Sequence, residues 1–335
     1  MNKLPFEQIE SKVLIKKELT TNESYGKRPE DRTVKELLDS SVICLNKPDG
    51  PSSHQVADYL RTALKVEKAG HGGTLDPGVS GVLPCALNKS TKVLEALLKA
   101  GKEYICLMHI HTPMTQSKIH KTSKEFIGKI MQMPPVKSAV KRQYREREIY
   151  YLEILEIKNQ DVLFKVGCQA GTYIRTICDS WGKALGTKAH MQQLIRTKAG
   201  PFKEDEWYSL QDIKDAFQLY EEGNEKELRK ILKPIEFGVT HLQKIWIIDS
   251  AVDSICHGAN LSIPGISKLS DQINKNDLVA IFTLKDELVA MGTAQLNSEE
   301  IIKLEKGLTI TIKKVFMDPE VYPHFKRENT IELKP

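Results

Sequence analysis

The hydrophobic pattern of residues 41–235 changes its period several times, and the changes predict strands and helices in mixed order. The apolar run 41–46 predicts a buried strand, and the two-residue alternation over 102–111 predicts a strand with two different faces. Ser52 and Gln55 have the spacing of a capping box and predict the start of a helix. The same patterns predict further helices over 90–99, 171–185 and 209–220, and a hairpin over 149–157 and 162–168. This mixture favours an α+β domain.

Residues 67–84 interrupt this pattern with the sequence EKAGHGGTLDPGVSGVLP. Glycine and proline at this density predict a long loop, and glycine lets the backbone come close to a ligand. Long loops inside compact domains are usually functional or disordered. The strand and helix signals on either side favour a loop that is held in place.

After Pro234 the chain consists of short apolar segments separated by Gly, Pro, Asn and Asp, which predicts a small, mostly β barrel. Before residue 41 it is polar except at Val13–Ile15, which predicts a tail that docks one short strand elsewhere. The predicted organisation has four parts, namely an N-terminal extension over 1–40, an α+β domain over 41–235, a β domain over 242–320 and a tail over 321–335.

The composition is that of a globular protein and adds a weak preference for a polyanionic partner. Hydrophobic residues make up 40% and charged residues 28% of the 335 residues, and the formal net charge is +5. The run Lys137–Arg147 can neutralise phosphates, although a solvated hairpin or helix face is the simpler interpretation. No apolar run approaches the roughly 20 residues of a membrane span, and the first residues lack the apolar core of a secretory signal. We therefore expect a cytoplasmic protein without a membrane partner.

The spacing of cysteine and histidine gives no metal site. The six cysteines form no CxxC pair, and most lie in apolar stretches, so we expect them to be structural. His109 and His111 share one face of the predicted strand 102–111, but no third ligand stands at a matching spacing. His190 and His241 have no assigned role. The sequence therefore predicts no metal ion.

Asp76 is the candidate for chemistry within the glycine-rich segment. It precedes Pro77, which biases its backbone towards extended or turn conformations and displays the carboxylate at a loop apex. A simpler interpretation is an Asx turn, in which the carboxylate accepts hydrogen bonds from nearby backbone N–H groups. The segment is not a phosphate-binding loop, because the GxxxxGKS/T pattern is absent.

The chain contains KPDGPSSH, GHGGTLDPGVSGVLP, GTYIR and LIRTKAGPF in this order. These segments resemble the motifs of the TruB/dyskerin family of pseudouridine synthases, at the family's approximate spacing. HGANLSIPGI and DLVAIFTLKDELVAMGTA, nearer the C-terminus, resemble a PUA domain. PPVKSAVKR at 134–142 and the absence of a long lysine-rich tail resemble the archaeal type, which includes tRNA pseudouridine synthase B and the catalytic subunit of box H/ACA ribonucleoproteins. The resemblance covers roughly residues 40–318.

The resemblance implies a pseudouridine synthase fold with a central mixed or antiparallel sheet, a C-terminal PUA barrel, and an N-terminal segment that packs on that barrel. It also implies an RNA-modifying isomerase that breaks the N1–C1′ bond of a uridine, turns the uracil and joins its C5 to C1′, without a cofactor or a metal. Asp76 matches the nucleophile of this family. Attack by the carboxylate on the sugar and prior deprotonation of C2′ are both open routes.

The other matching residues surround this chemistry. Arg175 matches the residue that pairs with the aspartate and keeps it ionised and aimed, although an arginine at a helix start is more often a surface residue. Tyr104 matches the aromatic residue that stacks on the extruded base, although a strand tyrosine is more often part of a core. The resemblance also assigns substrate-binding positions: Lys47 with Pro48, which support the loop and reach towards a phosphate, His71, which helps to flip the base, and Tyr173 and Leu194, which line the pocket.

Two substrate modes follow from the resemblance. In the guided mode, a box H/ACA guide RNA pairs with rRNA, the PUA domain holds the guide, and small companion proteins complete the particle. In the stand-alone mode, the enzyme recognises the T-arm of tRNA by shape and modifies its uridine at position 55. The archaeal features favour the guided mode. A non-catalytic RNA-binding scaffold is the main rival, and a nucleoside glycosidase is a weaker one because it needs a second catalytic carboxylate.

Overall fold

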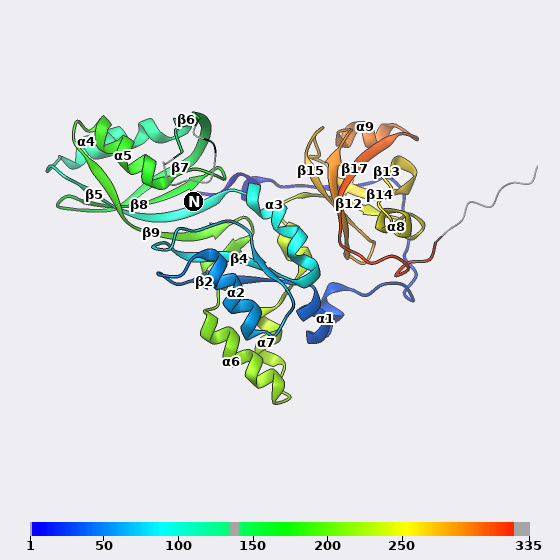
Figure 1. The fold of residues 1–335 in the computed structure, drawn as a ribbon. Helices are drawn as coiled ribbons and strands as arrows, with labels where there is room; N and C mark the ends of the chain where they lie inside the picture. The colour runs from blue at the N-terminus through cyan, green and yellow to red at the C-terminus, as the bar shows by residue number, and fades with distance from the viewer. Residues whose placement is uncertain (1, 135–140, 142, 325–335) are drawn as a thin grey trace, which may run out of the picture. The chain divides into compact units, whose positions relative to one another are not determined.

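The computed structural model describes residues 2–134, 141 and 143–324 of the chain. The chain divides into two compact units, one formed by residues 1–9 and 34–241 and the other by residues 10–33 and 242–335 (Figure 1). The basic segment PPVKSAVKR lies outside the described residues except at Pro134 and Lys141. No helix in the described ranges has the length and hydrophobicity needed to cross a membrane.

A mixed ten-stranded sheet forms the centre of the first unit. Only β4 and β9 are parallel neighbours among its described strands, and the other pairs are antiparallel. In spatial order the strands are β11 (Lys233–Pro234), β2 (Ser41–Lys47), β4 (Ser80–Leu87), β9 (Ala189–Ala199), β5 (Lys102–Ile110), β8 (Asp161–Cys168), β7 (Arg145–Lys158) and β6 (Gly128–Gln132), with β3 (Ala69–His71) on β4 and β10 (Phe202–Lys203) on β9. The predicted α+β class with a mixed sheet is confirmed.

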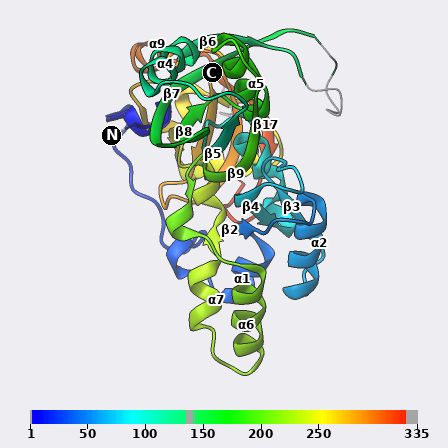
Figure 2. The same cartoon turned by 90° about the vertical axis from the view of Figure 1, so that its left-hand side faces the viewer.

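Two hydrophobic cores attach helices to this sheet. Around Leu45 of β2, the first core contains α2 (Ser53–Ala63), α6 (Leu210–Glu221) and α7 (Lys226–Ile231), and the last two helices lie side by side in both views (Figures 1 and 2). Around Phe164 of β8, the second core contains α4 (Gln116–Ser123) and α5 (Ile174–Ala184), with Trp181 fully buried. The remaining helices of this unit are the short α1 (Val34–Asp39) and α3 (Leu94–Lys99).

Several predicted boundaries move once strand pairing is known. The segment 67–84 is not one long loop, because β3 and the start of β4 lie inside it, and β3 pairs with residues 85–87 at the end of β4. What remains is the turn of residues 72–79, called the Asp76 loop below. The helix predicted from residue 171 begins only at Ile174, after an extended residue, and the one predicted from residue 90 begins as a 3-10 turn.

The second unit is a seven-stranded sheet. Its order is β1 (Val13–Ile15), β14 (Ile266–Ser270), β12 (Gln243–Ile247), β15 (Leu278–Phe282), β16 (Leu288–Ala294), β17 (Leu308–Val315) and β13 (Leu261–Ser262). β12 and β15 are parallel, and the sheet surrounds one hydrophobic core. Two short helices, α8 (Asp249–Cys256) and α9 (Ser298–Lys303), were not predicted, because so few turns give little periodic signal.

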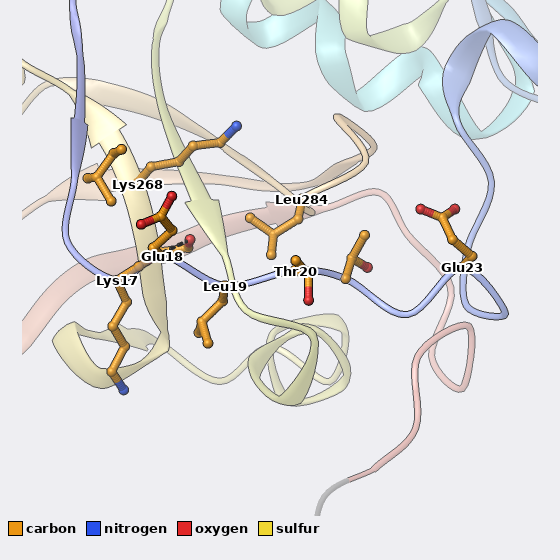
Figure 3. Close-up of a pocket in the computed structure, with 10 residues that line it drawn as sticks. Lys17, Glu18, Leu19, Thr20, Glu23, Lys268 and Leu284 are labelled. Carbon is orange, nitrogen blue, oxygen red and sulfur yellow. Dashed lines mark hydrogen bonds between the residues drawn. The ribbon is translucent and has the colours of Figure 1, made fainter.

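Residues 10–33 form part of this second unit. Leu14 of β1 stands opposite Leu269 of β14, so the short apolar stretch adds an edge strand to the sheet. Past that strand, the segment lines an open pocket together with β14 and Leu284, and Lys17 and Lys268 contribute to its polar lining (Figure 3). Of the predicted N-terminal extension 1–40, residues 10–33 are therefore built into the C-terminal unit, whereas residues 1–9 and 34–40 belong to the first unit.

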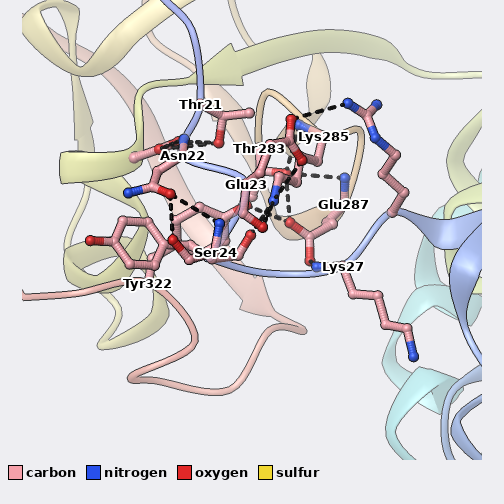
Figure 4. A network of polar contacts seen from close by, with 12 residues as sticks. Thr21, Asn22, Glu23, Ser24, Lys27, Thr283, Lys285, Glu287 and Tyr322 are labelled. Atoms are coloured by element: carbon pink, nitrogen blue, oxygen red, sulfur yellow. Dashed lines mark hydrogen bonds and ion pairs between the residues drawn. The ribbon is translucent and has the colours of Figure 1, made fainter.

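A polar network anchors the end of this extension (Figure 4). The buried ammonium of Lys285 donates to the backbone oxygens of Glu23 and Tyr25 at 3.0 and 2.5 Å. Glu287 accepts from the backbone N–H of Lys27 at 2.8 Å and from the hydroxyl of Tyr322 at 2.6 Å. Buried charges are tolerated here because each one is hydrogen-bonded.

Candidate active site

Buried side chains hold the backbone of the Asp76 loop from two sides. Ser53, the first residue of α2, binds both backbone groups of Leu75, since its hydroxyl donates to the oxygen at 3.0 Å and accepts from the N–H at 2.8 Å. Arg196 of β9 is 1% exposed, and it donates to the oxygens of Val82 and Gly73 at 2.7 and 3.0 Å. The residues before Asp76 are thereby fixed to both α2 and β9.

Lys47 holds the residues after Asp76. It ends β2 and is fully buried, and its ammonium donates to the oxygens of Pro48, Pro77 and Val79 at 2.8, 3.0 and 2.8 Å. Burial lowers the pKa of Lys47, and the nearby carboxylate of Asp76 acts in the opposite direction. Because three acceptors engage all three ammonium N–H groups, Lys47 supports the loop and has no donor left for a phosphate. These contacts favour the predicted support of the loop over the predicted reach towards a phosphate.

Asp76 itself points into solvent and pairs with Arg175. The two side chains are 55% and 50% exposed, and the Nη2 of Arg175 binds the Oδ2 of Asp76. Arg175 lies in the first turn of α5, which follows the extended residue Tyr173. The carboxylate therefore binds a residue 99 positions away rather than the backbone N–H groups of an Asx turn. An ion pair this exposed contributes only about 0–1 kcal/mol to stability, so its main effect is to orient the carboxylate.

Tyr104 lies next to the buried arginine of this site. It stands opposite Arg196 in the antiparallel pair of β5 and β9. Burial raises the pKa of Tyr104, and the charge of Arg196 opposes that shift. The carboxylate of Asp76 also raises this pKa, so the two predicted residues lie within electrostatic reach of each other. Leu194, two residues before Arg196 on β9, is partly buried against the second core.

His71 and Tyr173 lie on the elements that flank the loop. Burial, and then the neighbouring His54, lower the pKa of His71 and so favour its neutral ring. The rings of His54 and His71 meet edge to face at 5.8 Å, and the buried Nδ1 of His71 has no partner among the described residues. Tyr173 is fixed by Gln132, whose side chain accepts from its N–H at 3.0 Å and donates to its oxygen at 3.2 Å.

The structure thus joins Asp76 to Arg175 and surrounds the loop with Lys47, Tyr104 and Arg196. Sequence reasoning assigned no role to Arg196 or Ser53, although LIRTKAGPF and KPDGPSSH contain them. The only sequence signal for these two residues was their position within LIRTKAGPF and KPDGPSSH. Their function became visible only when strand pairing brought their side chains to the backbone of the Asp76 loop.

Four family profiles match consecutive parts of the chain. The N-terminal domain of the TruB family of pseudouridylate synthases matches residues 61–116 and 109–174, and the tRNA pseudouridylate synthase B C-terminal domain matches 175–240. A PUA domain matches residues 243–316 and a DKCLD domain matches 2–57.

Similar proteins cover almost the whole chain. A protein of Pyrococcus horikoshii named "Probable tRNA pseudouridine synthase B" is 53% identical over 318 residues, which is 94% of this chain and 95% of the relative. A protein of the same name from Methanopyrus kandleri is 48% identical over 96% of this chain and 95% of its own length. The fold matches the crystal structure of a Cbf5-Nop10-Gar1 complex with a TM-score of 0.94 at 50% identity, covering 97% and 99% of the two chains. It also matches an H/ACA RNP bound to a substrate RNA containing 2'-deoxyuridine, with a TM-score of 0.90 at 48% identity over 96% and 99%.

Proposed function

Because this chain belongs to the TruB family of pseudouridylate synthases and forms pseudouridine in RNA, we propose that Asp76 is its nucleophile. The observation that carries this assignment is the ion pair between Asp76 and Arg175. The guanidinium stabilises the ionised carboxylate, which is the reactive form, and fixes its direction. Tyr104 then supports the target uracil, which must leave its stack to reach the carboxylate.

The arrangement suits a reaction that breaks and remakes a bond at one sugar carbon. The N1–C1′ bond of the uridine breaks while Asp76 acts as nucleophile, the uracil turns, and its C5 bonds to C1′. The hydrogen on C5 then leaves as a proton, and the carboxylate is released unchanged. A covalent step divides one difficult substitution into two easier ones. Rigid support of the Asp76 loop favours this step, because small errors in the position of a nucleophile are costly in rate.

For the substrate we propose two RNA classes. The similar structures are an H/ACA RNP with substrate RNA and a Cbf5-Nop10-Gar1 complex, which supports guided modification of rRNA with a box H/ACA RNA and small companion proteins. The relatives named as tRNA pseudouridine synthases support a second activity on the T-arm uridine at position 55 of tRNA. We assign His71, Tyr173 and Leu194 to the substrate pocket and Lys47 to the support of the loop. Neither a cofactor nor a metal takes part in this reaction.

We further propose the division of labour along the chain. Residues 41–235 carry out the isomerisation, and residues 242–320 bind RNA, with the extension 1–40 built against them and 321–335 as a tail. The PUA profile over 243–316 and the edge strand β1 support this division. Since its RNA substrates reside there, we assign the enzyme to the cytoplasm.

Tritium release from RNA labelled at uracil C5 tests the assignment directly, because that hydrogen leaves when C5 bonds to C1′. Wild type, Asp76→Asn and the control Asp215→Asn, which changes an exposed carboxylate on α6, are compared with a tRNA transcript alone. They are then compared with a guide RNA, its target and the companion proteins. We expect release by wild type and the control but none by Asp76→Asn, while all three bind RNA equally.

The possible outcomes separate the assignment from its rivals. Release in one arrangement but not the other identifies the substrate mode. Equal release by Asp76→Asn would show that Asp76 is not the nucleophile. Binding without release in either arrangement would favour the non-catalytic scaffold, for which the exposed pairing of Asp76 and Arg175 has no use.

A further inference from the structure

Three histidines and an aspartate meet at the ends of strands β5, β8 and β9. His109 of β5 stands opposite Asp161 on β8 and opposite His190 on β9. Paired residues of adjacent strands point to the same face, so these side chains form one row. His111 follows the last residue of β5, and its ring contacts the rings of both His109 and His190. Strand pairing therefore supplies the third imidazole that spacing along the sequence does not show.

The three rings lie close to one another. The centroid distances are 5.1 Å between His111 and His190, 5.5 Å between His109 and His190, and 6.0 Å between His109 and His111. Imidazoles whose nitrogens lie about 2.0–2.1 Å from a tetrahedral Zn²⁺ have ring centroids about 5 Å apart. The rings are thus spaced almost as three ligands of one ion would be.

Asp161 orients His109 in the way that a carboxylate orients a metal ligand. Its Oδ1 lies 2.6 Å from the Nδ1 of His109, which donates to it when that nitrogen carries the proton. The Nε2 of His109 then carries the lone pair and is the nitrogen left to bind an ion. Histidines that bind metals commonly donate their second nitrogen to a carboxylate in this manner, which fixes the tautomer and the ring.

One adjustment separates this cluster from a formed site. In the described residues, no group of three or more histidine, cysteine, aspartate or glutamate side chains is placed so that it could hold a metal ion as it stands. Here the Nε2 of His111 and the Nδ1 of His190 are hydrogen-bonded at 2.9 Å, whereas two nitrogens on one tetrahedral ion lie about 3.3 Å apart. Both side chains are exposed, while the backbone N–H of His111 donates to the oxygen of Lys188 at 2.9 Å. A small rotation of either ring makes room for the ion.

We propose that His109, His111 and His190 bind one divalent transition-metal ion of the Zn²⁺ class, with Asp161 as a positioning residue. Neutral imidazoles suit Zn²⁺ and its neighbours in the first transition row, and three protein ligands leave a fourth position for water. The ion would join β5 to β9 near the end of their ladder, where His109 pairs with His190 and Ile110 pairs with Ala189. The site shares no residue with the pair of Asp76 and Arg175, so it stands apart from the proposed function.

Calorimetric titration with ZnCl₂ tests the site, using the full chain without a histidine tag and stripped of metal with a chelator. We expect one high-affinity ion per chain, and Co²⁺ bound in its place should show the visible absorption of a tetrahedral complex. His190→Ala should abolish this binding. Asp161→Asn should retain it with an affinity about 10–100-fold weaker, because only the orientation of His109 is lost.

A second group in the chain provides the control. His257 and His324 lie 3.5 and 2.8 Å from the carboxylate of Asp253, so this group is the alternative place for a metal. His257→Ala should bind Zn²⁺ as wild type does. Circular dichroism checks that each variant is folded. The proposal is overturned if His190→Ala keeps the stoichiometry and affinity of wild type, if wild type binds no ion, or if His257→Ala is the variant that loses it.

Discussion

Lys47→Met tests whether the Asp76 loop is held through its backbone. Methionine has a similar length, but it removes a buried charge and three hydrogen bonds. The oxygen of Pro77 keeps a donor, because the N–H of Gly50 lies 3.0 Å away. The oxygens of Pro48 and Val79 lose the hydrogen bond from the Lys47 ammonium. A buried carbonyl left without a partner costs about 1–3 kcal/mol, and relief of the buried charge offsets part of this. We expect the free energy of unfolding to fall by about 2–4 kcal/mol.

The same substitution should reduce catalysis without weakening RNA binding. A nucleophile displaced by about 1 Å can lose roughly 100-fold in rate, so we expect a loss of that order in single-turnover tritium release. The ammonium of Lys47 contacts backbone oxygens and no solvent, so RNA affinity and its dependence on salt should remain those of wild type. A residue that binds phosphate would behave in the opposite way.

Urea unfolding, tritium release and RNA affinity at several salt concentrations measure these three effects on one variant. Lys214→Met, on the exposed surface of α6, is the matched control and should change stability by less than about 0.5 kcal/mol. Support of the loop by Lys47 is refuted if Lys47→Met is as stable as the control and if the salt dependence of its RNA affinity falls by about one phosphate contact. That result would restore Lys47 to the substrate-binding residues.

Three further predictions concern other parts of the catalytic unit. Arg175→Gln removes a half-exposed ion pair, so urea unfolding should show a loss below about 1 kcal/mol, while tritium release should fall about 100-fold or more because Asp76 loses its orienting partner. Gly81→Ala adds a Cβ 2.3 Å from the backbone oxygen of Arg196 at a φ of +108°, and urea unfolding should show a loss above about 2 kcal/mol; an equal stability would mean that β4 and β9 can move apart. Burial lowers the pKa of His241 to about 4, so the unfolded chain binds more protons between about pH 6.5 and 4, and stability should fall by at most about 3 kcal/mol as the pH drops through that window. His241→Gln should remove this part of the pH dependence. The prediction is contradicted if wild type and His241→Gln lose the same free energy of unfolding between pH 7 and 4.5.

Features governed by neighbouring residues could be predicted from the sequence. Ser52 and Ser209 cap their helices, and each accepts from the backbone N–H three residues later. In the strand 102–111, the face with Cys106 and Met108 is buried, and the face with His109 is more open, as the alternation predicts. These signals need only the local period of the chain and the chemistry of a cap.

Features governed by distant residues could not be predicted. Lys47 and Asp76 were both identified, yet only the paired strands show that the lysine ends beneath the loop with its donors engaged. His190 reaches His109 through the register of β9, 81 residues away along the chain. A shift of that register by one residue would turn His190 to the other face, and no local pattern fixes it.

The way the Asp76 loop is held explains how the proposed nucleophile can be exposed while its backbone is held in place. Ser53, Lys47 and Arg196 all bind backbone atoms of the loop or of the strand that follows it, so the loop does not depend on the side chain of Asp76 for its shape. The carboxylate is then available to Arg175 and to the substrate. Buried cations that bind the backbone also bring positive charge beneath a reactive carboxylate without neutralising it through direct contact. The residues that hold the loop are thus different from the residue proposed to react. Substitutions of Ser53, Lys47 or Arg196 should therefore lower the free energy of unfolding more than substitutions of Asp76 do.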